Sequence, residues 1–590
     1  MSAICGIFNP SGDIDKTALD NIAKPLKHRG NRGSCKYVDK KIALLTIPFK
    51  TKTDFSEVAF NERRDIIAIL DGYLLNYEEL IKCLDKADIE SFADLIVILY
   101  EKFGLEFVKK LDGDFAFAIW DSRNEKLILG KDISNNKQIY YSKIEGNFIF
   151  ASEIKGLFKF QGIKKTIDLG SVSNFLNFGH ISFPYTLFDG IRRVKPSSIM
   201  VIQKNKIYEK EFWDINFNLK LPWSEERIID LLENSTRKRL NISDNWGLFL
   251  SGGLDSTTLL YFLDKLSADT VNTFTIGIGE DGKYGRMASE FFGTKHTDFF
   301  PSSSDIIKIS PKALWFYEFP LWHVGSFMYY LTKISRNINF AFWGQGSEEI
   351  FFGRRDYVIV KKLQVLNKNT PKFMKNLFNK LIVKLPHSKL YTLSRIAFSN
   401  DSYNQYVSFR EVLTDIEKNN LLSDQISSID PLKRIKKFNN KLSKDPVKNY
   451  SYLTLRNGFL SDTFMNISQE LLNPYFDKKV IEYCYAIPTE IKLKNSIFRY
   501  VLKKIMSDKL PASLLNRKPE TWPMKPWFKE QKNIMYDVID RLKKRKIIKE
   551  NIYKAINPNS SHYDRKIWSL FNLEILCEVF LDNDPKNPKI

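Results

Sequence analysis

A glycine-rich loop in the second half of the chain carries the residue types that bind a phosphate group. Its two glycines allow a ligand to approach the main chain closely, and the start of the helix that follows presents free N–H groups to an anion. Serine hydroxyls add donors, and the carboxylate of Asp255 can hold Mg²⁺. An ordinary turn before a helix is the alternative, and the Walker A lysine of simple phosphoryl transfer is missing. The loop consists of Ser251, Gly252, Gly253, Leu254, Asp255 and Ser256.

A second loop supplies further acidic oxygens. Asp255 and Glu348 could share a Mg²⁺ that bridges the phosphates of ATP, because carboxylates are ligands that this hard cation prefers. The six histidines and five cysteines lack the close spacing of transition-metal sites, so a metal held by imidazole or thiolate is not expected. The second loop contains Gly344, Gln345, Gly346, Ser347, Glu348 and Glu349.

Both loops are expected at the carboxyl ends of parallel strands. Residues 246–250 form an apolar run that leads directly into the first loop, and residues 340–343 lead into the second. A further apolar run, residues 273–277, follows the helix after the first loop. This order of strand, loop, helix and strand is the βαβ pattern of a parallel sheet. Ligands bind at the carboxyl ends of such strands, so the pattern predicts one site containing both loops.

The first 210 residues have a different texture, in which short apolar runs alternate with turns. Such spacing predicts packed sheets. Two helices, at residues 17–27 and 93–111, are indicated by apolar residues three and four positions apart. The predicted strands cover residues 42–47, 66–70, 115–120, 126–129, 148–151 and 198–202.

The second half begins with a predicted helix at residues 226–238 and is mainly helical from about residue 355. We therefore expect two domains, residues 1–212 and residues 222–590. The first is of the α+β class, and the second is of the α/β class with a helical C-terminal part.

Composition and charge limit the choice of partners. The chain is 43% hydrophobic, which indicates a folded protein, and it lacks a signal-peptide pattern and an apolar stretch long enough to span a membrane. We therefore expect a cytoplasmic protein. The net charge of +21 could attract polyanions, with its densest part at residues 361–448. No nucleic-acid-binding motif accompanies this charge, so nucleic acid is not expected as a partner.

Nine stretches in a fixed order resemble asparagine synthetases and their relatives over nearly the whole chain. The resemblance implies a class II glutamine amidotransferase-like domain with an Ntn-type sandwich. It also implies an ATP-pyrophosphatase domain, similar to the adenine nucleotide α-hydrolases. Such synthetases adenylate a carboxylate, release pyrophosphate and let an amine or ammonia displace AMP. The matching stretches are residues 28–30, 71–72, 76–77, 111–117, 151–155, 250–256, 346–349, 474–477 and 510–511.

The resemblance also implies roles for individual residues. Asp255 and Glu348 would bind Mg²⁺, and Gln345, Glu348 and Lys518 are candidate catalytic residues. Lys518 would stabilise the departing pyrophosphate, although its spacing is shifted by one residue, and the alternative is an exposed surface lysine. The nucleotide or its pyrophosphate would contact Leu250, Ser251, Gly252, Gly253, Asp255, Ser256, Ile276 and Gly344.

The first half departs from the family where glutamine should release ammonia. The family uses an N-terminal cysteine whose own amine is the base, but Cys5 lies behind four residues, so it is a small apolar strand residue unless a propeptide is removed. Residues 71–73 read Asp-Gly-Tyr in place of Asn-Gly-Glu, and a carboxylate there would repel an oxyanion. Phe92 replaces an acidic anchor, and residues 44–48 lack an expected arginine. We expect glutaminase activity to be lost.

Three functions follow from these patterns. Gln345 replaces a glutamate of the family and cannot act as a base, which is unlike conventional asparagine formation. Relatives with an inactive amidotransferase half, such as β-lactam synthetases and lasso-peptide cyclases, close amide rings instead. Our first hypothesis is therefore an ATP-dependent ligase that couples an Asp- or Glu-type carboxylate to an amine within a peptide or small molecule, with a leader-peptide protein or protease as partner. The alternatives are an asparagine synthetase using glutamine or ammonia, and an inactive scaffold.

Overall fold

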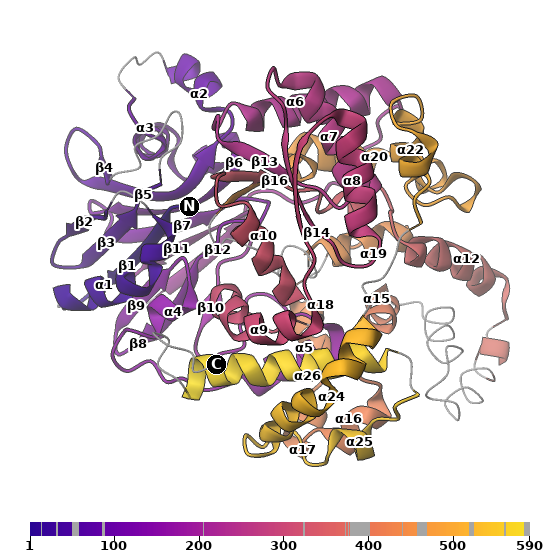
Figure 1. Cartoon of the computed structure of the whole chain (residues 1–590). Coiled ribbons are helices and arrows are strands. Elements are labelled where there is room, and N and C mark those ends of the chain that lie inside the picture. Colours follow the sequence, from indigo (N-terminus) through magenta and orange to yellow (C-terminus); the bar gives the residue numbers. More distant parts are fainter. Residues whose placement is uncertain are drawn as a thin grey trace.

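Figure 1 shows a computed structural model of the chain, in which the two sheets of the first half lie in indigo and purple and the C-terminal helices in orange and yellow. The structure describes residues 1–12, 14–30, 33–49, 58–84, 89–204, 206–321, 325–371, 373–375, 377, 402–438, 441–456, 469–518, 524–559 and 562–582.

The first half contains two six-stranded antiparallel sheets that pack face to face. One sheet has the order β10 (Arg192–Arg193), β8 (Tyr140–Ile144), β9 (Asn147–Ala151), β1 (Ala3–Phe8), β3 (Ile42–Ile47) and β2 (Cys35–Val38). The other has the order β12 (Lys206–Glu211), β11 (Ser198–Gln203), β7 (Lys126–Lys131), β6 (Gly113–Asp121), β5 (Ile66–Leu74) and β4 (Ala59–Phe60).

Strand β5 shows how the side-chain alternation builds this sandwich. Ile67 and Ile69 face the other sheet, whereas Ala68 and Leu70 face the core beneath α3 (Phe92–Phe103). Both faces are covered, so all nine residues of β5 are buried. The remaining helical segments of this half are α1 (Lys16–Ala23), η1 (Lys24–Arg29), α2 (Tyr77–Leu84), η2 (Gly104–Lys110), α4 (Ile154–Leu157) and α5 (Leu169–Phe178).

The second half is built on a five-stranded parallel sheet. Its order is β15 (Lys295–Phe299), β14 (Asn272–Ile276), β13 (Trp246–Phe249), β16 (Phe340–Phe342) and β17 (Glu470–Leu472). Helix α6 (Glu225–Leu240) precedes this sheet, and α7 (Leu254–Leu266) and α8 (Asp281–Phe292) connect its strands. The predicted βαβ unit is present. Edge strand β17 was not predicted, because its three residues lie within a region that reads as helical.

Helices make up most of the rest of this half. Between β15 and residue 456 they are α9 (Ser303–Tyr317), η3 (Gly325–Met328), α10 (Tyr329–Ile334), α11 (Ser347–Ile350), α12 (Arg355–Asn369), α15 (Ser402–Arg410), α16 (Asp415–Leu421), α17 (Asp424–Ser427), α18 (Leu432–Phe438) and α19 (Pro446–Thr454). After β17 they are η5 (Pro474–Phe476), α20 (Lys478–Ala486), α21 (Thr489–Lys492), η6 (Lys494–Ser496), α22 (Tyr500–Ile505), α23 (Ala512–Leu515), α24 (Met524–Asp540), η7 (Arg541–Lys543), α25 (Ile552–Ala555), α26 (Tyr563–Cys577) and η8 (Glu578–Asp582). No helix within the described residues is long and apolar enough to cross a membrane.

Candidate active site

The two glycine-containing loops meet at the carboxyl end of the parallel sheet. Strands β13 and β16 are neighbours, and α7 and α11 begin directly after them. Gly344 packs against the first loop so closely that a Cβ there would lie 3.1 Å from the nitrogen of Ser256. The hydroxyl of Ser347 donates a hydrogen bond of 2.8 Å to Asp255. Residues from both loops therefore face one another as the sequence predicted.

Hydroxyl groups and a glycine conformation shape the first loop. The Ser251 hydroxyl accepts from the nitrogen of Gly253 at 3.2 Å, and the Ser256 hydroxyl accepts from the nitrogen of Ser251 at 3.3 Å. Gly252 has a φ of +69°, and a Cβ there would lie 2.2 Å from the carbonyl carbon of Tyr284. Only glycine fits this approach. Gly253 is the N-cap of α7, so the N–H groups at the start of this helix can face an anion.

Asp255 and Glu348 converge on one guanidinium group. The terminal nitrogen of Arg499 donates to Asp255 at 2.8 Å and to Glu348 at 2.6 Å. Burial raises the pKa of Asp255, and the charge of Glu348 adds to this effect, while Arg499 opposes it. Burial opposes the charge of Arg499 itself, but the two carboxylates outweigh it and raise its pKa. The site therefore pairs two acidic side chains through a positive charge between them.

A second arginine contacts the first loop beside Lys518. Arg517 donates a hydrogen bond of 2.6 Å to the carbonyl of Ser251 and pairs with Asp281. Its guanidinium lies 4.6 Å from the ring centre of Tyr284, and its side chain is 8% exposed. Lys518 itself is exposed. Its role stays a prediction, while the cation held at the loop is Arg517.

The other predicted residues surround the two loops. Leu250 is buried and its nitrogen donates to the carbonyl of Phe274, and Ile276 is buried at the end of β14. Gln345 is half-buried, and its carbonyl accepts a hydrogen bond of 2.9 Å from the side chain of Asn473. The hydroxyl of Tyr475, two residues further on, donates to the carbonyl of Asp255 at 2.9 Å. One short segment after β17 thus contacts both loops.

The predicted glutamine pocket contains the protein's own side chains. Cys5 lies in the middle of β1, is fully buried, and burial raises the pKa of its thiol. This confirms that it is an apolar strand residue. Ser2 instead lies against the altered residues of β5, where its hydroxyl donates to Asp71 at 2.9 Å and accepts from the nitrogen of Gly72 at 3.0 Å. The N–H group that an oxyanion would need is therefore already bonded.

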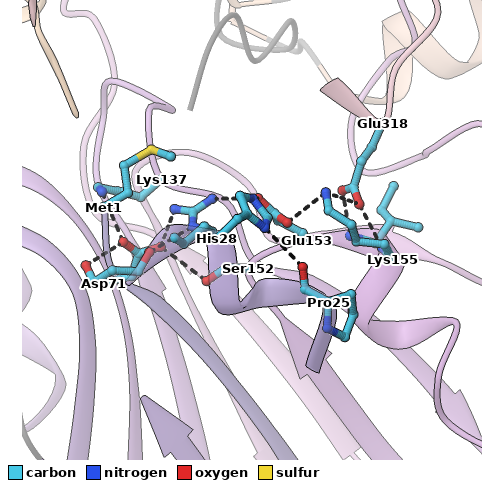
Figure 2. A network of polar contacts seen from close by, with 12 residues as sticks. Met1, Pro25, His28, Asp71, Lys137, Ser152, Glu153, Lys155 and Glu318 are labelled. Atoms are coloured by element: carbon cyan, nitrogen blue, oxygen red, sulfur yellow. Dashed lines mark hydrogen bonds and ion pairs between the residues drawn. The ribbon is translucent and has the colours of Figure 1, made fainter. Parts of the chain in front are cut away.

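Asp71 is held by four donors in this pocket (Figure 2). Besides Ser2, these are Arg29 at 2.9 Å, Lys137 at 3.0 Å and Ser152 at 3.1 Å. Burial acts to raise the pKa of Asp71, but Lys137 and Arg29 outweigh it and lower the pKa. A charged carboxylate thus occupies this position.

The other two positions at which the sequence departs from the family, Phe92 and residues 44–48, carry buried apolar side chains. Phe92 is fully buried and packs with Tyr77 at a ring distance of 5.1 Å. Leu44, Leu45 and Ile47 are buried in β3. These side chains offer no polar group for an amino acid.

Sequence reasoning missed three residues of the site. Arg499 follows no motif that we recognised, and Arg517 is adjacent to the lysine that we selected. Only Ser2 could have been found from the sequence, because its position directly before the first strand places it near the predicted glutamine pocket. Within the described residues, no group of three or more His, Cys, Asp or Glu side chains suits a metal ion.

Two families match the chain. The asparagine synthase family matches residues 227–579, and the glutamine amidotransferase domain family matches residues 1–213. Asparagine synthetase (glutamine-hydrolysing) 1 of Bacillus subtilis is 24% identical and covers 79% of this chain and 77% of its own length. Asparagine synthetase (glutamine-hydrolysing) 2 of the same organism is 23% identical and covers 99% of this chain and 79% of its own length. Asparagine synthetase (glutamine-hydrolysing) 3 of Arabidopsis thaliana is 26% identical and covers 59% of this chain and 61% of its own length.

Proposed function

The chain belongs to the asparagine synthase family and is an ATP-dependent carbon–nitrogen ligase, and from this premise we propose that it amidates an aspartate-type carboxylate with ammonia. The resemblance and the fold classes drawn from the sequence agree with the families that match. The names of the relatives support the asparagine synthetase alternative better than the macrolactam reaction that we placed first. Domain limits, site residues, a leader-peptide or protease partner and a cytoplasmic location stay predictions.

The convergence of Asp255, Glu348 and Arg499 beside the phosphate-binding loop carries this proposal. A positive charge fits between the two carboxylates, because both already bond one guanidinium nitrogen. Their hard oxygen atoms suit Mg²⁺, which often takes one or two carboxylates and completes its shell with phosphate and water oxygens. When bound there, Mg²⁺ would neutralise the phosphates of ATP and stabilise the departing pyrophosphate.

The chain's own residues supply the rest of the chemistry. The N–H groups at the start of α7 would bind the pyrophosphate, with the serine hydroxyls of the loop as further donors. Arg517, fixed against Ser251, would place a second positive charge on the same side. The substrate carboxylate then displaces pyrophosphate from the α-phosphate, and ammonia displaces AMP from the acyl carbon. Two bonds form and two break, so AMP and pyrophosphate are the products beside the amide.

The occupied pocket in the first half supports free ammonia as the nitrogen source. Glutamine would need a nucleophile, an oxyanion donor and an anchor for its amine. The buried thiol of Cys5 lies within a strand, the nitrogen of Gly72 is bonded to Ser2, and Phe92 is apolar. We therefore propose that this half does not hydrolyse glutamine.

A second candidate is amide formation with an amine of the substrate itself, as in a peptide macrolactam. It is favoured by Gln345, a neutral amide where the family has a glutamate. It requires the same adenylation at the same loops. The two candidates differ only in the nucleophile and in the size of the acyl substrate.

The test incubates the purified protein with ATP, Mg²⁺ and aspartate, and adds ammonium or glutamine in parallel. We expect asparagine, AMP and pyrophosphate in equal amounts with ammonium, and none above background with glutamine alone. Mass spectrometry quantifies the amino acids, and a coupled assay measures pyrophosphate. Equal rates with glutamine would contradict the proposal, and pyrophosphate release only with a peptide would favour the second candidate.

A pair of Asp→Asn variants on α7 checks where ATP is cleaved. Asp255→Asn should lower pyrophosphate release about 100-fold or more, because it removes a charged ligand from the phosphate site. Asp264→Asn makes the same change at an exposed position of the same helix and should leave the rate unchanged within about twofold. Equal loss in both variants would mean that α7 tolerates no change, and the site would need another assignment.

A further inference from the structure

Seven charged side chains of alternating sign form one continuous chain through the first half, and we refer to them as the ion chain. Figure 2 labels Glu318, Lys155, Glu153, Asp71 and Lys137 from this set. Successive partners lie 3.1, 2.7, 3.3, 2.9, 3.0 and 2.6 Å apart. None of these side chains is more than 6% exposed, so water and salt screen them little. In order they are Glu318, Lys155, Glu153, Arg29, Asp71, Lys137 and Glu470.

Both ends of the ion chain belong to the second half. Glu318 follows α9, has a φ of 57°, and its carboxylate accepts from the main-chain nitrogens of Ile154 and Lys155 at 2.6 and 2.7 Å. A non-glycine residue in the left-handed region is uncommon, so its surroundings hold it there. Glu470 is the first residue of β17. The ion chain therefore fastens the first half to the second at two separate places.

The Glu470 end leads directly to the ATP site. Lys137 contacts both oxygens of Glu470, at 2.6 and 2.7 Å. The nitrogen of Glu470 donates to the carbonyl of Asn339, and β17 then pairs with β16. Three residues after Glu470, Asn473 bonds the carbonyl of Gln345, and Tyr475 bonds that of Asp255. The placement of β17 therefore governs both loops.

The charge of Glu470 makes this placement depend on the first half. A buried carboxylate without a positive partner is strongly unfavourable. If Lys137 were lost, the N-terminal amine of Met1 would still lie 3.8 Å from Glu470, but burial lowers the pKa of that amine and so weakens it as a positive partner. Glu470 would then have to turn toward water or take up a proton. Either change would move β17 at its first residue, and the hydrogen bonds to Gln345 and Asp255 would follow.

We propose that Lys137 and Glu470 are positioning residues for the two ATP loops, so that the former glutamine pocket now supports the synthetase site. This inference rests on the proposed function for its activity readout. It assigns the first half a role that does not need glutamine. Lys137 acts through Glu470, β17 and Asn473 and touches no substrate itself.

A second buried ion pair provides a matched control. Lys566 in α26 contacts both oxygens of Glu417 in α16, at 2.6 and 2.8 Å, and both side chains are at most 4% exposed. This pair has the same chemistry as Lys137 and Glu470. Glu417 also accepts hydrogen bonds from Thr414 at the start of α16, and neither Lys566 nor Glu417 belongs to the two loops or to the ion chain.

The experiment compares Lys137→Met with Lys566→Met. Both should lower the melting temperature, but only Lys137→Met should lower kcat for pyrophosphate release, by about tenfold or more, with the KM for ATP changed less than kcat. Hydrogen exchange of residues 344–353 should rise in Lys137→Met and stay unchanged in Lys566→Met. An unchanged kcat and unchanged exchange in Lys137→Met, or an equal loss of kcat in both variants, would overturn the proposal.

The double variant Lys137→Met with Glu470→Gln keeps the test decisive if the single variant folds poorly. It leaves no unpaired carboxylate, so β17 should stay closer to its native place. We expect kcat and loop protection to recover at least about threefold from the single variant. No recovery would contradict positioning by this pair. If the wild-type protein releases no pyrophosphate, the proposed function fails, and hydrogen exchange alone decides the positioning.

Discussion

Arg517 and Lys518 show how much one residue step matters at the pyrophosphate site. The motif spacing favours Lys518, yet the side chain that bonds Ser251 belongs to Arg517. Sequence spacing cannot decide between them, because the segment after α23 is a loop and its side-chain directions follow no period. The sequence could place a cation here but not select which one.

The first prediction tests this difference. Arg517→Met should lower pyrophosphate release about 100-fold, since removing one donor from a site of developing negative charge commonly has that effect. Lys518→Met should change the rate less than about threefold, because the side chain is exposed. Steady-state kinetics of pyrophosphate release measures both. The opposite order of effects would restore Lys518 as the catalytic cation.

The geometry of β1 decides which residue near the start of the chain contacts Asp71. Cys5, Ala3 and Ile7 face the core beneath α1, whereas Ile4 and Phe8 face the other sheet. Cys5 therefore points away from Asp71, which lies in β5 of that other sheet. The sequence allowed Cys5 to be recognised as a strand residue, but the contact of Ser2 with β5 depends on sheet packing, which no local pattern encodes.

At the scale of elements, strong apolar runs were predicted well and weak ones were missed. All six predicted strands of the first half lie within β3, β5, β6, β7, β9 and β11. The predicted helix at residues 17–27 is α1 followed by the 3₁₀ turn η1, because Pro25 has no N–H for a helical bond. The helix at residues 93–111 likewise ends at Gly104, which has a φ of 55°.

Apart from β8, which lies between β10 and β9, the strands that no apolar run predicted are edge strands. β15 is an edge strand of mixed, mostly polar residues, and β17 is the opposite edge with three residues. Edge strands bury less apolar surface, so their sequences carry a weaker signal. This limit affected the site directly, because β17 carries Glu470 and leads to Asn473.

A buried lysine joins two of the short helices behind the second loop. Lys492, the last residue of α21, is fully buried and donates a hydrogen bond of 3.1 Å to the carbonyl of Ile350, the last residue of α11. Its ammonium lies 3.6 Å from the ring centre of Phe352. Burial lowers the pKa of Lys492 to about 7.

This lowered pKa predicts a pH-dependent stability. The unfolded chain keeps an ordinary lysine pKa near about 10.4, so between about pH 7 and 10 the unfolded state binds more protons. Stability therefore rises with pH over this window through Lys492. In Lys492→Met this contribution is lost, and the melting temperature should rise less between pH 7 and 9.5 than in the wild type.

Thermal scans in a buffer series measure this slope, with Lys494→Met as the control. Lys494 lies two residues away and is exposed, so its substitution should keep the wild-type slope. A wild-type slope in Lys492→Met would show that groups other than Lys492 produce the rise. Glu349 would not be one of them, because its raised pKa of about 8 makes stability fall as pH rises toward 8.

At the scale of the whole molecule, the ion chain gives the first half a structural role that does not depend on the hydrolysis of glutamine. Replacing a buried ion pair by apolar residues is often neutral or stabilising. A scaffold without function would therefore tolerate apolar residues in place of Asp71, Arg29 and Lys137. The observed side chains instead continue to Glu470 and Glu318 in the second half. The two halves are therefore one electrostatic unit, and changes in the first should be felt at the ATP site.

The net charge of +21 predicts that the association of ATP with the protein depends on salt concentration. A strongly positive protein draws an anionic substrate toward it, and salt screens this attraction beyond about 8 Å at physiological ionic strength. The kcat/KM for ATP should therefore fall about tenfold as NaCl rises from about 50 to 500 mM, while kcat at saturating ATP stays nearly constant. Initial rates in NaCl, compared with sucrose of equal osmolarity, separate screening from an osmotic effect. A kcat/KM that ignores salt would mean that the lysines are too dispersed to steer ATP, and local donors such as Arg499 and Arg517 would then account for its capture.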